Sequence, residues 1–249
     1  LSESRGKESS GMAIKNGKDN KIHVMKKSIP ASKFVVSSEF NDFFSTSLNS
    51  AFSTGKLEAP IALIAHARLV TNGSQENNNN NQPVIKSDTV AVHNGIITNV
   101  DDLWEKYAFL NREFEVDTEV FVAMISYKMH NGKSIIDAVQ ESYQEMKGTA
   151  SVAILLADSS TVILSSNNAS LYFSYNLEKQ ILLFASENFI LKTAIEKLKL
   201  IEEFNVSEPI WSKPFSGKLL NSETFALVDF GLRENVNLPA NKFHEKKDV

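Results

Sequence analysis

The sequence predicts an α+β fold in which antiparallel strands and helices form separate layers. Two helical patterns follow each other directly, and groups of short β-rich runs lie before and after them. The breaks between the later β-rich runs are short and polar, which favours antiparallel neighbours because parallel strands need long crossover connections. Strands and helices therefore come in blocks, unlike the regular alternation of a βαβ protein.

The first sixty or so positions are of mixed character. Residues 9–14 and 22–25 have the pattern of short strands, and the Asn16-Gly17 pair between them is a hairpin signal because both residue types tolerate positive φ. A following segment rich in Ser and Phe contains a candidate helix at residues 39–44. We expect a hairpin and a helix from this part of the chain.

Two apolar strands then end in polar clusters. The first strand is predicted at residues 61–68 and the second at residues 89–92, with a polar loop at residues 72–82 between them. The polar groups at the two strand ends are not explained by packing. Functional residues often lie where loops leave a rigid scaffold, so these strand ends are the first candidates for a functional site.

Helical spacing of apolar residues predicts three helices after the second strand. The first covers residues 99–107, and Asn99 is its predicted cap. The second is amphipathic, begins at Asp117 and ends at Asn131-Gly132, and the third is amphipathic and is capped by Ser134. The last two helices are therefore amphipathic helices that follow each other directly.

From residue 149 onwards the period changes to that of strands. Four short β-rich runs with polar breaks predict an antiparallel meander. A helix at residues 188–201 and a last strand at residues 224–230 are expected to follow. The four runs are residues 150–156, 161–165, 171–175 and 180–186.

Length and composition allow one α/β-type domain or two small ones. A chain of 249 residues with 42% hydrophobic content can bury a sizeable core. No stretch has the composition of an interdomain linker, and there is no internal repeat. We therefore expect one domain over residues 1–249, with residues 231–249 as a possible tail or linker.

Charge and residue usage exclude several classes of function. The net charge is −4 with no basic stripe, which argues against a nucleic-acid partner. No apolar run approaches the roughly eighteen residues of a membrane helix, and the polar N-terminal residues do not resemble a secretory signal. There are no cysteines, which excludes disulfides and thiolate metal sites within this sequence. We expect a cytoplasmic protein with no membrane partner.

The polar groups at the two strand ends have two interpretations each. Arg68 would emerge at a sheet end, suited either to bidentate capture of a carboxylate or to a structural salt bridge. Asn94-Gly95 is by default a turn. It could also be an oxyanion hole, with the Asn94 amide and the Gly95 N–H as donors. The sequence leaves these alternatives open.

Two further features are ambiguous in the same way. Asp117 at a helix start is most simply a cap, but its carboxylate could also hold a substrate ammonium. The asparagine run at residues 77–81 is most simply a solvent loop, and between two site strands it could also be a lid.

Other chemical signatures are missing from the sequence. The five histidines have no metal-ligand spacing, and His66 and His93 are expected to be hydrogen-bonded strand-end residues. There is no GxG phosphate fingerprint and no Gly-x-Ser-x-Gly elbow. We predict no metal ion and no cofactor.

Taken in order, the short motifs resemble those of the class II glutamine amidotransferase domain, an N-terminal-nucleophile hydrolase. The segment at residues 93–97, His-Asn-Gly-Ile-Ile, matches one of the family's motifs outright. The resemblance extends over residues 1 to about 230, and it leans toward the amino-sugar synthase type. The other matching segments are an Arg-Gly…Ser-x-Gly pattern within residues 1–14, His66-Ala67-Arg68, Thr71-Asn72-Gly73, Asp117-Thr118-Glu119 and Ala185-Ser186-Glu187.

The resemblance implies a four-layer αββα sandwich of two antiparallel sheets and a glutaminase reaction that yields glutamate and ammonia. It implies that Asn94 and Gly95 stabilise the tetrahedral oxyanion. It further implies that Arg68 grips the glutamine α-carboxylate and Asp117 its α-ammonium. Thr71 and Gly73 would form the substrate-facing loop. The partner would be a synthase or transferase domain or subunit that receives ammonia, and a homo-oligomer is possible.

The sequence departs from the family pattern at its start. In this family a cysteine at the mature N-terminus attacks the amide, with its own α-amine as the base. Leu1 aligns inside the helix that follows that strand, so we expect about twenty upstream residues beginning with Cys. Ser2 is no substitute because it aligns with the helix. Asn72 also stands where many family members have His.

Two other classes of function remain. A binding or regulatory relative would keep the glutamine pocket and perform no catalysis, gaining thermal stability from glutamine or glutamate. A structural α+β domain would use the same residues only as caps and turns, and neither ligand would shift its melting temperature.

Overall fold

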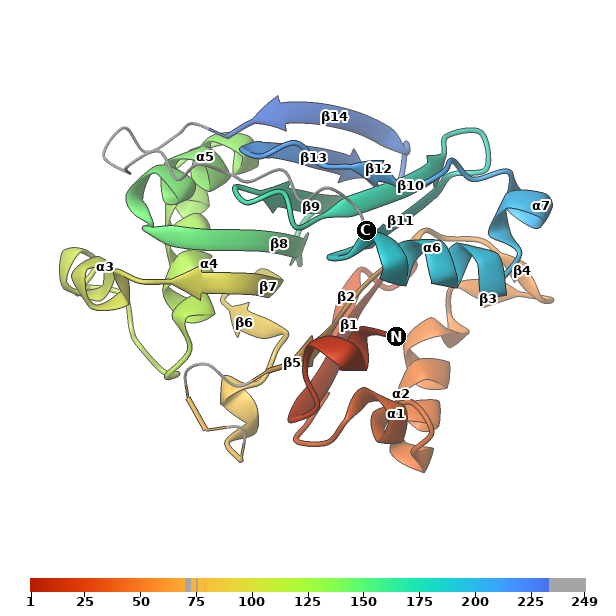
Figure 1. The fold of residues 1–249 in the computed structure, drawn as a ribbon, viewed down its shortest axis with the longest axis horizontal. Helices are drawn as coiled ribbons and strands as arrows, with labels where there is room; N and C mark the ends of the chain where they lie inside the picture. Colours follow the sequence, from red (N-terminus) through yellow and green to blue (C-terminus); the bar gives the residue numbers. More distant parts are fainter. Residues whose placement is uncertain (70–72, 75, 233–249) are drawn as a thin grey trace.

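We describe residues 1–69, 73, 74 and 76–232 of a computed structural model of the chain. Helices gather at two opposite sides of the molecule, with antiparallel sheets between them (Figure 1). The described residues contain no helix that is both long enough and apolar enough to cross a membrane. Of the predicted tail, residues 231–249, only residues 231 and 232 are described, and the rest lies outside the described residues.

The N-terminal part of the chain forms a hairpin, a helical segment and a long strand. The predicted hairpin is confirmed, since β1 and β2 pair antiparallel on either side of the turn after Asn16. Residues 39–44 lie within a helix of twelve residues, longer than predicted. The elements are η1 (Ser2–Arg5), β1 (Ser9–Asn16), β2 (Lys21–Lys27), α1 (Ala31–Phe34), α2 (Ser38–Asn49), β3 (Phe52–Ser53), β4 (Lys56–Leu57) and β5 (Ile61–Arg68).

The middle of the chain supplies two strands, three helices and two more strands. The strand predicted at residues 89–92 is longer and runs through the His-Asn-Gly-Ile-Ile segment. The elements are η2 (Asn78–Asn80), β6 (Val84–Lys86), β7 (Thr89–Ile97), α3 (Val100–Lys106), α4 (Asp117–His130), α5 (Ile135–Glu145), β8 (Gly148–Leu156) and β9 (Thr161–Ser166).

The C-terminal part completes both sheets. The helix predicted at residues 188–201 is two helices, and the strands β12 and β13 were not predicted. The elements are β10 (Tyr172–Asn176), β11 (Ile181–Ala185), α6 (Asn188–Lys197), α7 (Leu200–Phe204), β12 (Ile210–Trp211), β13 (Ser216–Asn221) and β14 (Ala226–Gly231).

One six-stranded antiparallel sheet has the order β14-β13-β9-β8-β7-β6. Opposite it lie two three-stranded groups, β2-β1-β5 and β11-β10-β12. The expected single meander is therefore wrong. β8 pairs with β9 in the first sheet, whereas the chain then crosses over and β10 pairs with β11 in the other layer. The crossing occurs at residues 167–171.

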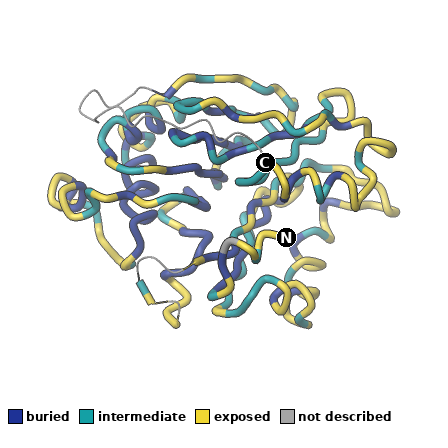
Figure 2. The backbone as a smooth tube through the Cα atoms, viewed as in Figure 1, coloured by how far each residue is buried: buried dark blue, intermediate teal, exposed yellow. Residues whose placement is uncertain are grey.

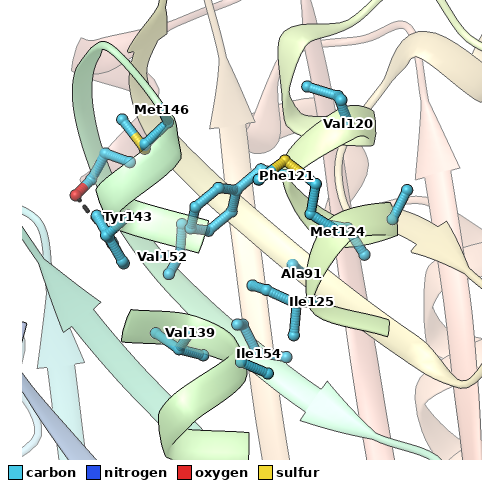
Figure 3. Packing of buried hydrophobic residues seen from close by; sticks show 14 of the residues in the cluster. Ala91, Val120, Phe121, Met124, Ile125, Val139, Tyr143, Met146, Val152 and Ile154 are labelled. Carbon is cyan, nitrogen blue, oxygen red and sulfur yellow. Dashed lines mark hydrogen bonds between the residues drawn. The ribbon is translucent and has the colours of Figure 1, made fainter. Parts of the chain in front are cut away.

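Three hydrophobic clusters lie between the layers and establish their order. The first packs α4 and α5 on one face of the six-stranded sheet, with Phe121 edge-on to Tyr143 (Figure 3). The second joins the other face of that sheet to the strands opposite, as Leu155 and Phe173 illustrate. In the third, Leu191 of α6 packs toward β10 and β11. The αββα arrangement is confirmed.

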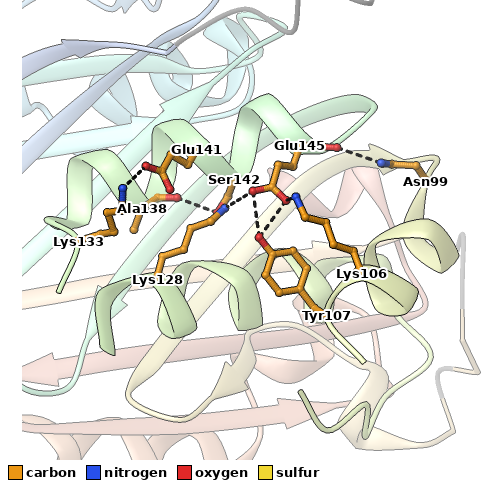
Figure 4. A network of polar contacts seen from close by, with 9 residues as sticks. All are labelled: Asn99, Lys106, Tyr107, Lys128, Lys133, Ala138, Glu141, Ser142 and Glu145. Atoms are coloured by element: carbon orange, nitrogen blue, oxygen red, sulfur yellow. Dashed lines mark hydrogen bonds and ion pairs between the residues drawn. The ribbon is translucent and has the colours of Figure 1, made fainter. Parts of the chain in front are cut away.

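The predicted amphipathic α4 is instead buried on nearly all sides. Burial concentrates along α4 and the central strands (Figure 2), and even Ser126 and Lys128 of this helix are buried. The Lys128 ammonium pairs with Glu145 of α5 at 2.8 Å, and Glu145 also accepts from Lys106 and from the Tyr107 hydroxyl (Figure 4). Because a buried charge needs a partner, this network allows three helices to pack together.

The helix caps were predicted with mixed success. Ser134 accepts from the Asp137 N–H and caps α5 as expected, and Gly132, at φ +85°, follows α4. Asn99 stands at the start of α3, but its side chain makes no cap there. It bonds instead to the Glu145 carbonyl and the Lys147 N–H. It thus ties the start of α3 to the end of α5.

A buried lysine stabilises the contact between the layers. The Lys15 ammonium of β1 donates to the carbonyls of Leu156, Ala157 and Ser159, at 2.6, 3.0 and 2.6 Å. We expect Lys15→Met to lower the free energy of unfolding by about 1–3 kcal/mol because buried carbonyls lose their donor. Urea unfolding measures the change, and Lys18→Met at an exposed position is the control. Equal stability of the two variants would contradict this assignment.

Candidate active site

A cavity of about 700 Å³ opens where the ends of β5, β7, β8 and β11 come together. Four of the predicted site residues line it: Arg68, Asn94, Gly95 and Asp117. Gly73 is not on the wall but lies behind Arg68, and Thr71 lies outside the described residues. Four of these residues, from distant parts of the chain, therefore meet at one cavity.

Arg68 ends β5 and is only 4% exposed. Its Nη1 donates to Asn81 Oδ1 at 3.0 Å and its Nη2 to the Gly73 carbonyl at 3.2 Å. Burial lowers the pKa of the guanidinium, and the Asp117 carboxylate partly reverses that effect. The Asn81 and Gly73 oxygens help to hold the guanidinium in place at the cavity wall. A guanidinium is suited to bind a carboxylate ligand.

The asparagine run is a solvent loop only in part, because residues 77–79 are exposed but the last two asparagines are not. Asn80 and Asn81 are fully buried. Asn80 accepts from the Glu115 N–H and donates to the Ser74 carbonyl, whereas Asn81 supports Arg68. The end of the run is therefore a fixed support for the site, because short amide side chains can satisfy backbone groups that turn away from a strand.

Asp117 is the first residue of α4, but it is not a helix cap. No side-chain cap bond forms at this helix start, and Asp117 Oδ2 instead accepts from the Ile97 N–H at 2.9 Å. The carboxylate is 6% exposed and lines the cavity. The helix start favours negative charge there, and Arg68 contributes a positive potential. Asp117 and Arg68 therefore line the same cavity.

Asn94 and Gly95 lie inside β7 rather than in a turn, so the default interpretation of this pair is wrong. They pair with Ser151 and Ala150 of β8. The Thr98 N–H bonds to the Lys147 carbonyl at the end of the same ladder. Backbone groups of successive strand residues point to opposite sides, so the even-numbered residues of β7 bond to β8.

The same alternation directs the Gly95 N–H away from β8. The N–H groups of His93 and Ile97 point to that side as well, and side chains of Gln82 and Asp117 bind them. Gly95 stands between them on the cavity wall, at φ +148°. This edge is therefore placed to present a backbone donor to the cavity.

The Asn94 side chain is oriented by the crossing segment between the sheets. The Ser170 hydroxyl donates to the Ser186 carbonyl at 3.1 Å, so its oxygen is left to accept from Asn94 Nδ2 at 3.4 Å. The Ser170 N–H is held in turn by Asn168 Oδ1. Asn94 thus presents its NH₂ group, which a developing oxyanion requires.

His93 is a buried neutral support. Its Nε2 lies 3.3 Å from the Thr149 carbonyl, and its Nδ1 lies 3.1 Å from the Thr118 hydroxyl. A carbonyl only accepts, so Nε2 carries a proton. In the neutral ring Nδ1 then accepts from the Thr118 hydroxyl, whose alternative acceptor is Asp117 Oδ1 at 3.4 Å. Burial lowers the pKa of His93, although Asp117 opposes the shift. The expectation of a hydrogen-bonded histidine is confirmed, within the strand rather than at its end.

This lowered pKa predicts a pH dependence of stability. The unfolded state protonates at the ordinary value of 6.5 and the folded state only at lower pH. The unfolded state therefore binds more protons as the pH falls below about 6.5. We expect the free energy of unfolding to drop there by up to ~1.4 kcal/mol per pH unit, and His93→Gln to flatten this slope.

Urea unfolding of the wild type and His93→Gln between pH 5 and pH 8 measures this slope. His130→Gln is the control because the His130 side chain is 59% exposed. Parallel pH profiles for the wild type and His93→Gln would contradict the predicted neutral state.

Several supporting residues were not predicted from the sequence. Gln82 bonds to His93, Thr118 bonds to His93 and Asp117, and Ser170 bonds to Asn94. All three line the cavity. Thr118 stands within the Asp117-Thr118-Glu119 motif, which could have suggested it. Gln82 and Ser170 carry no such signal, since their positions depend on how distant strands meet. No cluster of His, Cys, Asp and Glu that could hold a metal ion occurs among the residues described.

Residues 66–193, just over half of the chain, match the model of the glutamine amidotransferase domain family. The chain belongs to this family. Among curated relatives, glutamine–fructose-6-phosphate aminotransferase of Vibrio parahaemolyticus is 28% identical over 148 residues, which is 58% of this chain and 24% of that relative. The enzyme of the same name from Acinetobacter baylyi is 33% identical over 113 residues, 45% of this chain and 18% of that relative. The chain thus spans about a quarter of their length.

Solved structures share the fold of this glutamine amidotransferase domain. The glutamine phosphoribosylpyrophosphate amidotransferase of B. subtilis, complexed with ADP and GMP, aligns with a TM-score of 0.64 at 17% identity, covering 94% of this chain and 45% of that chain. A class-II glutamine aminotransferase domain protein from Silicibacter pomeroyi aligns with a TM-score of 0.52 at 11% identity, covering 91% and 100%. The predicted family and fold class are confirmed.

Proposed function

We propose that this chain is the glutaminase domain of an amidotransferase, which hydrolyses glutamine to glutamate and ammonia for use elsewhere. The observation that carries the proposal is the convergence of a guanidinium, a carboxylate and an Asn-Gly strand edge on one cavity. A free amino acid is a zwitterion, so its recognition needs both a cation and an anion. The family membership supports the same chemistry.

Each residue has a distinct role in this proposal. The Arg68 guanidinium binds the α-carboxylate, and Asp117 binds the α-ammonium. The Asn94 amide and the Gly95 N–H stabilise the oxyanion that forms on the side-chain carbonyl. The Gly73 carbonyl accepts a hydrogen bond from the Arg68 guanidinium, so Gly73 acts by holding Arg68. Thr71 is proposed to act in the same loop.

The nucleophile in this proposal is a cysteine at the start of a strand upstream of the printed sequence. Its thiolate attacks the side-chain amide and expels ammonia, and water then cleaves the thioester to release glutamate. The strand would lie between β5 and β11, which are the outermost strands of their three-stranded groups. Residues 65–69 and 184–186 of these edges line the cavity. Unpaired edges accept an added strand readily, which supports this location.

The ammonia acceptor belongs to a synthase or transferase domain or subunit. The curated relatives are named as aminotransferases of fructose 6-phosphate, and they extend well beyond the aligned part. This supports an amino-sugar synthase as the complete enzyme. A cytoplasmic location, a single domain over residues 1–249 and possible homo-oligomers are parts of the same proposal.

A non-catalytic glutamine- or glutamate-binding relative is the second candidate. The observation that favours it is that a cation and an anion line one cavity, which suffices to bind the amino acid without any reaction. Such a protein would use the same Arg68 and Asp117 contacts to sense the amino acid.

The full-length native protein distinguishes the candidates. N-terminal sequencing and intact mass are expected to show upstream residues beginning with Cys, and a glutaminase assay is expected to show ammonia release. Glutamate is expected to raise the melting temperature for either candidate. Ligand stabilisation without ammonia release would leave only the binding protein, and no stabilisation would contradict both.

A further inference from the structure

The side chain of Gln82 binds the backbone of β7 next to the oxyanion pair. Its Oε1 accepts from the His93 N–H at 2.6 Å, and its Nε2 donates to the His93 carbonyl at 2.8 Å. A backbone N–H only donates and a carbonyl only accepts, so the orientation of the amide is fixed. Gln82 is 8% exposed and lines the cavity.

This contact replaces a missing part of the sheet. β6 pairs with β7 up to Val84 opposite Ala91, and continuing that register places Gln82 opposite His93. The Gln82 amide supplies the donor and acceptor that a strand would have supplied, so β7 keeps its strand geometry beyond the end of β6.

The Gly95 N–H lies between two such contacts. Gln82 holds the His93 N–H on one side of it, and Asp117 holds the Ile97 N–H on the other. Both contacts lie on the edge that faces away from β8. The direction of the Gly95 N–H is therefore set by side chains on either side of it, since no β6 residue pairs with this part of β7.

We infer that Gln82 is a positioning residue that aims the Gly95 N–H at the oxyanion. The inference rests on the proposed glutaminase function. It predicts that Gln82 acts on the transition state and not on glutamine binding, because Arg68 and Asp117 bind the α-groups. A donor that is misdirected stabilises the tetrahedral oxyanion less, while ground-state contacts stay in place.

Gly11 of β1 shows how closely Gln82 is held. A Cβ at Gly11 would lie 2.1 Å from the Gln82 carbonyl oxygen and 2.9 Å from Pro83 Cδ. Gly11→Ala therefore displaces the Gln82 backbone without altering its side chain. This gives a second, independent way to disturb the same contact.

The main test is Gln82→Met in the full-length native protein, with ammonia release and glutamate binding by calorimetry as readouts. We expect kcat to fall about 10- to 100-fold, less than the ~10²–10³ of removing an oxyanion donor outright. KM for glutamine and Kd for glutamate should change less than threefold. The calorimetric stoichiometry counts folded sites, so partial unfolding does not imitate a lower kcat.

Gln140→Met is the matched control, because the Gln140 amide also bonds to a backbone carbonyl, that of Gly231, but on the exposed side of α5. Its kcat should equal that of the wild type. Gly11→Ala should lower kcat in the same way as Gln82→Met, again with KM retained.

Gln82→Glu adds a readout that a purely structural role would not give. Its carboxylate can accept from the His93 N–H but faces the His93 carbonyl with a second oxygen. Protonation restores a donor, so the ratio of variant to wild-type kcat should rise as the pH falls. This variant also keeps the inference testable if Gln82→Met does not fold.

This inference alone is overturned if the wild type is active and the kcat of Gln82→Met lies within threefold of the wild-type value. It is also overturned by a variant in which KM rises and kcat is retained. A wild-type protein that releases no ammonia overturns the proposed function and this inference together.

Discussion

Arg68→Met is expected to abolish recognition of the amino acid. A guanidinium bound to a carboxylate contributes charge-assisted hydrogen bonds of about 1.5–3 kcal/mol each, so losing a bidentate pair weakens binding roughly 10²–10⁴-fold. The glutaminase kcat/KM should fall by a similar factor, mainly through KM. The buried Asp117 would also lose its nearby cation.

A thermal-shift titration with glutamate measures the loss of binding affinity and does not require catalysis. Glutamate at about 100 times the wild-type Kd should stabilise the wild type by ~2.7 kcal/mol, whereas the same concentration should stabilise Arg68→Met by at most ~0.4 kcal/mol over its own baseline. Arg112→Met is the control, since Arg112 is 44% exposed and pairs only loosely with Asp101 at 3.5 Å. A normal glutamate shift in Arg68→Met would remove Arg68 from the site.

Gly95→Ala is expected to have the largest effect on stability. A Cβ at Gly95 would lie 2.0 Å from the Thr149 carbonyl oxygen, a backbone atom of the paired strand. The residue also has φ +148°, which side chains rarely adopt. Either β7 separates from β8 or the variant fails to fold. We expect a loss of more than ~4 kcal/mol, which is exceptional for one substitution.

Gly132→Ala is the matched control for this variant. Gly132 also has positive φ, +85°, but a Cβ there would meet no atom within 4 Å. Its substitution should lower the free energy of unfolding by only about 1 kcal/mol, the usual effect of placing alanine in a left-handed conformation. Equal losses for the two variants in urea unfolding would show that Gly95 is needed for its φ alone.

Much of the fold could be predicted because it depends on local patterns. The strand β5 was predicted with its observed bounds, and the Asn16-Gly17 hairpin and the Ser134 cap were predicted correctly. These features arise from alternation, turn chemistry and capping, which act within a few residues. The short strands β12 and β13 were missed because nothing in their composition separates them from loops.

Errors occurred where a distant segment changes the role of a residue. Asn94-Gly95 has the local chemistry of a turn, but β8 pairs with it and makes it a strand. Asn80 and Asn81 have the composition of a solvent loop, but the loop before α4 and Arg68 bury them. In each case tertiary contacts outweigh a weak local preference.

By itself, the sequence determined the α+β class and, through its motifs, four of the residues that line the cavity. Only the tertiary structure decided that the second layer is divided into two groups and that Arg68 and Asp117 face the same cavity. It also decided that the Gly95 N–H points away from β8. The physical reason is that these features depend on strand register and on contacts between residues far apart in the chain, whereas propensities act locally.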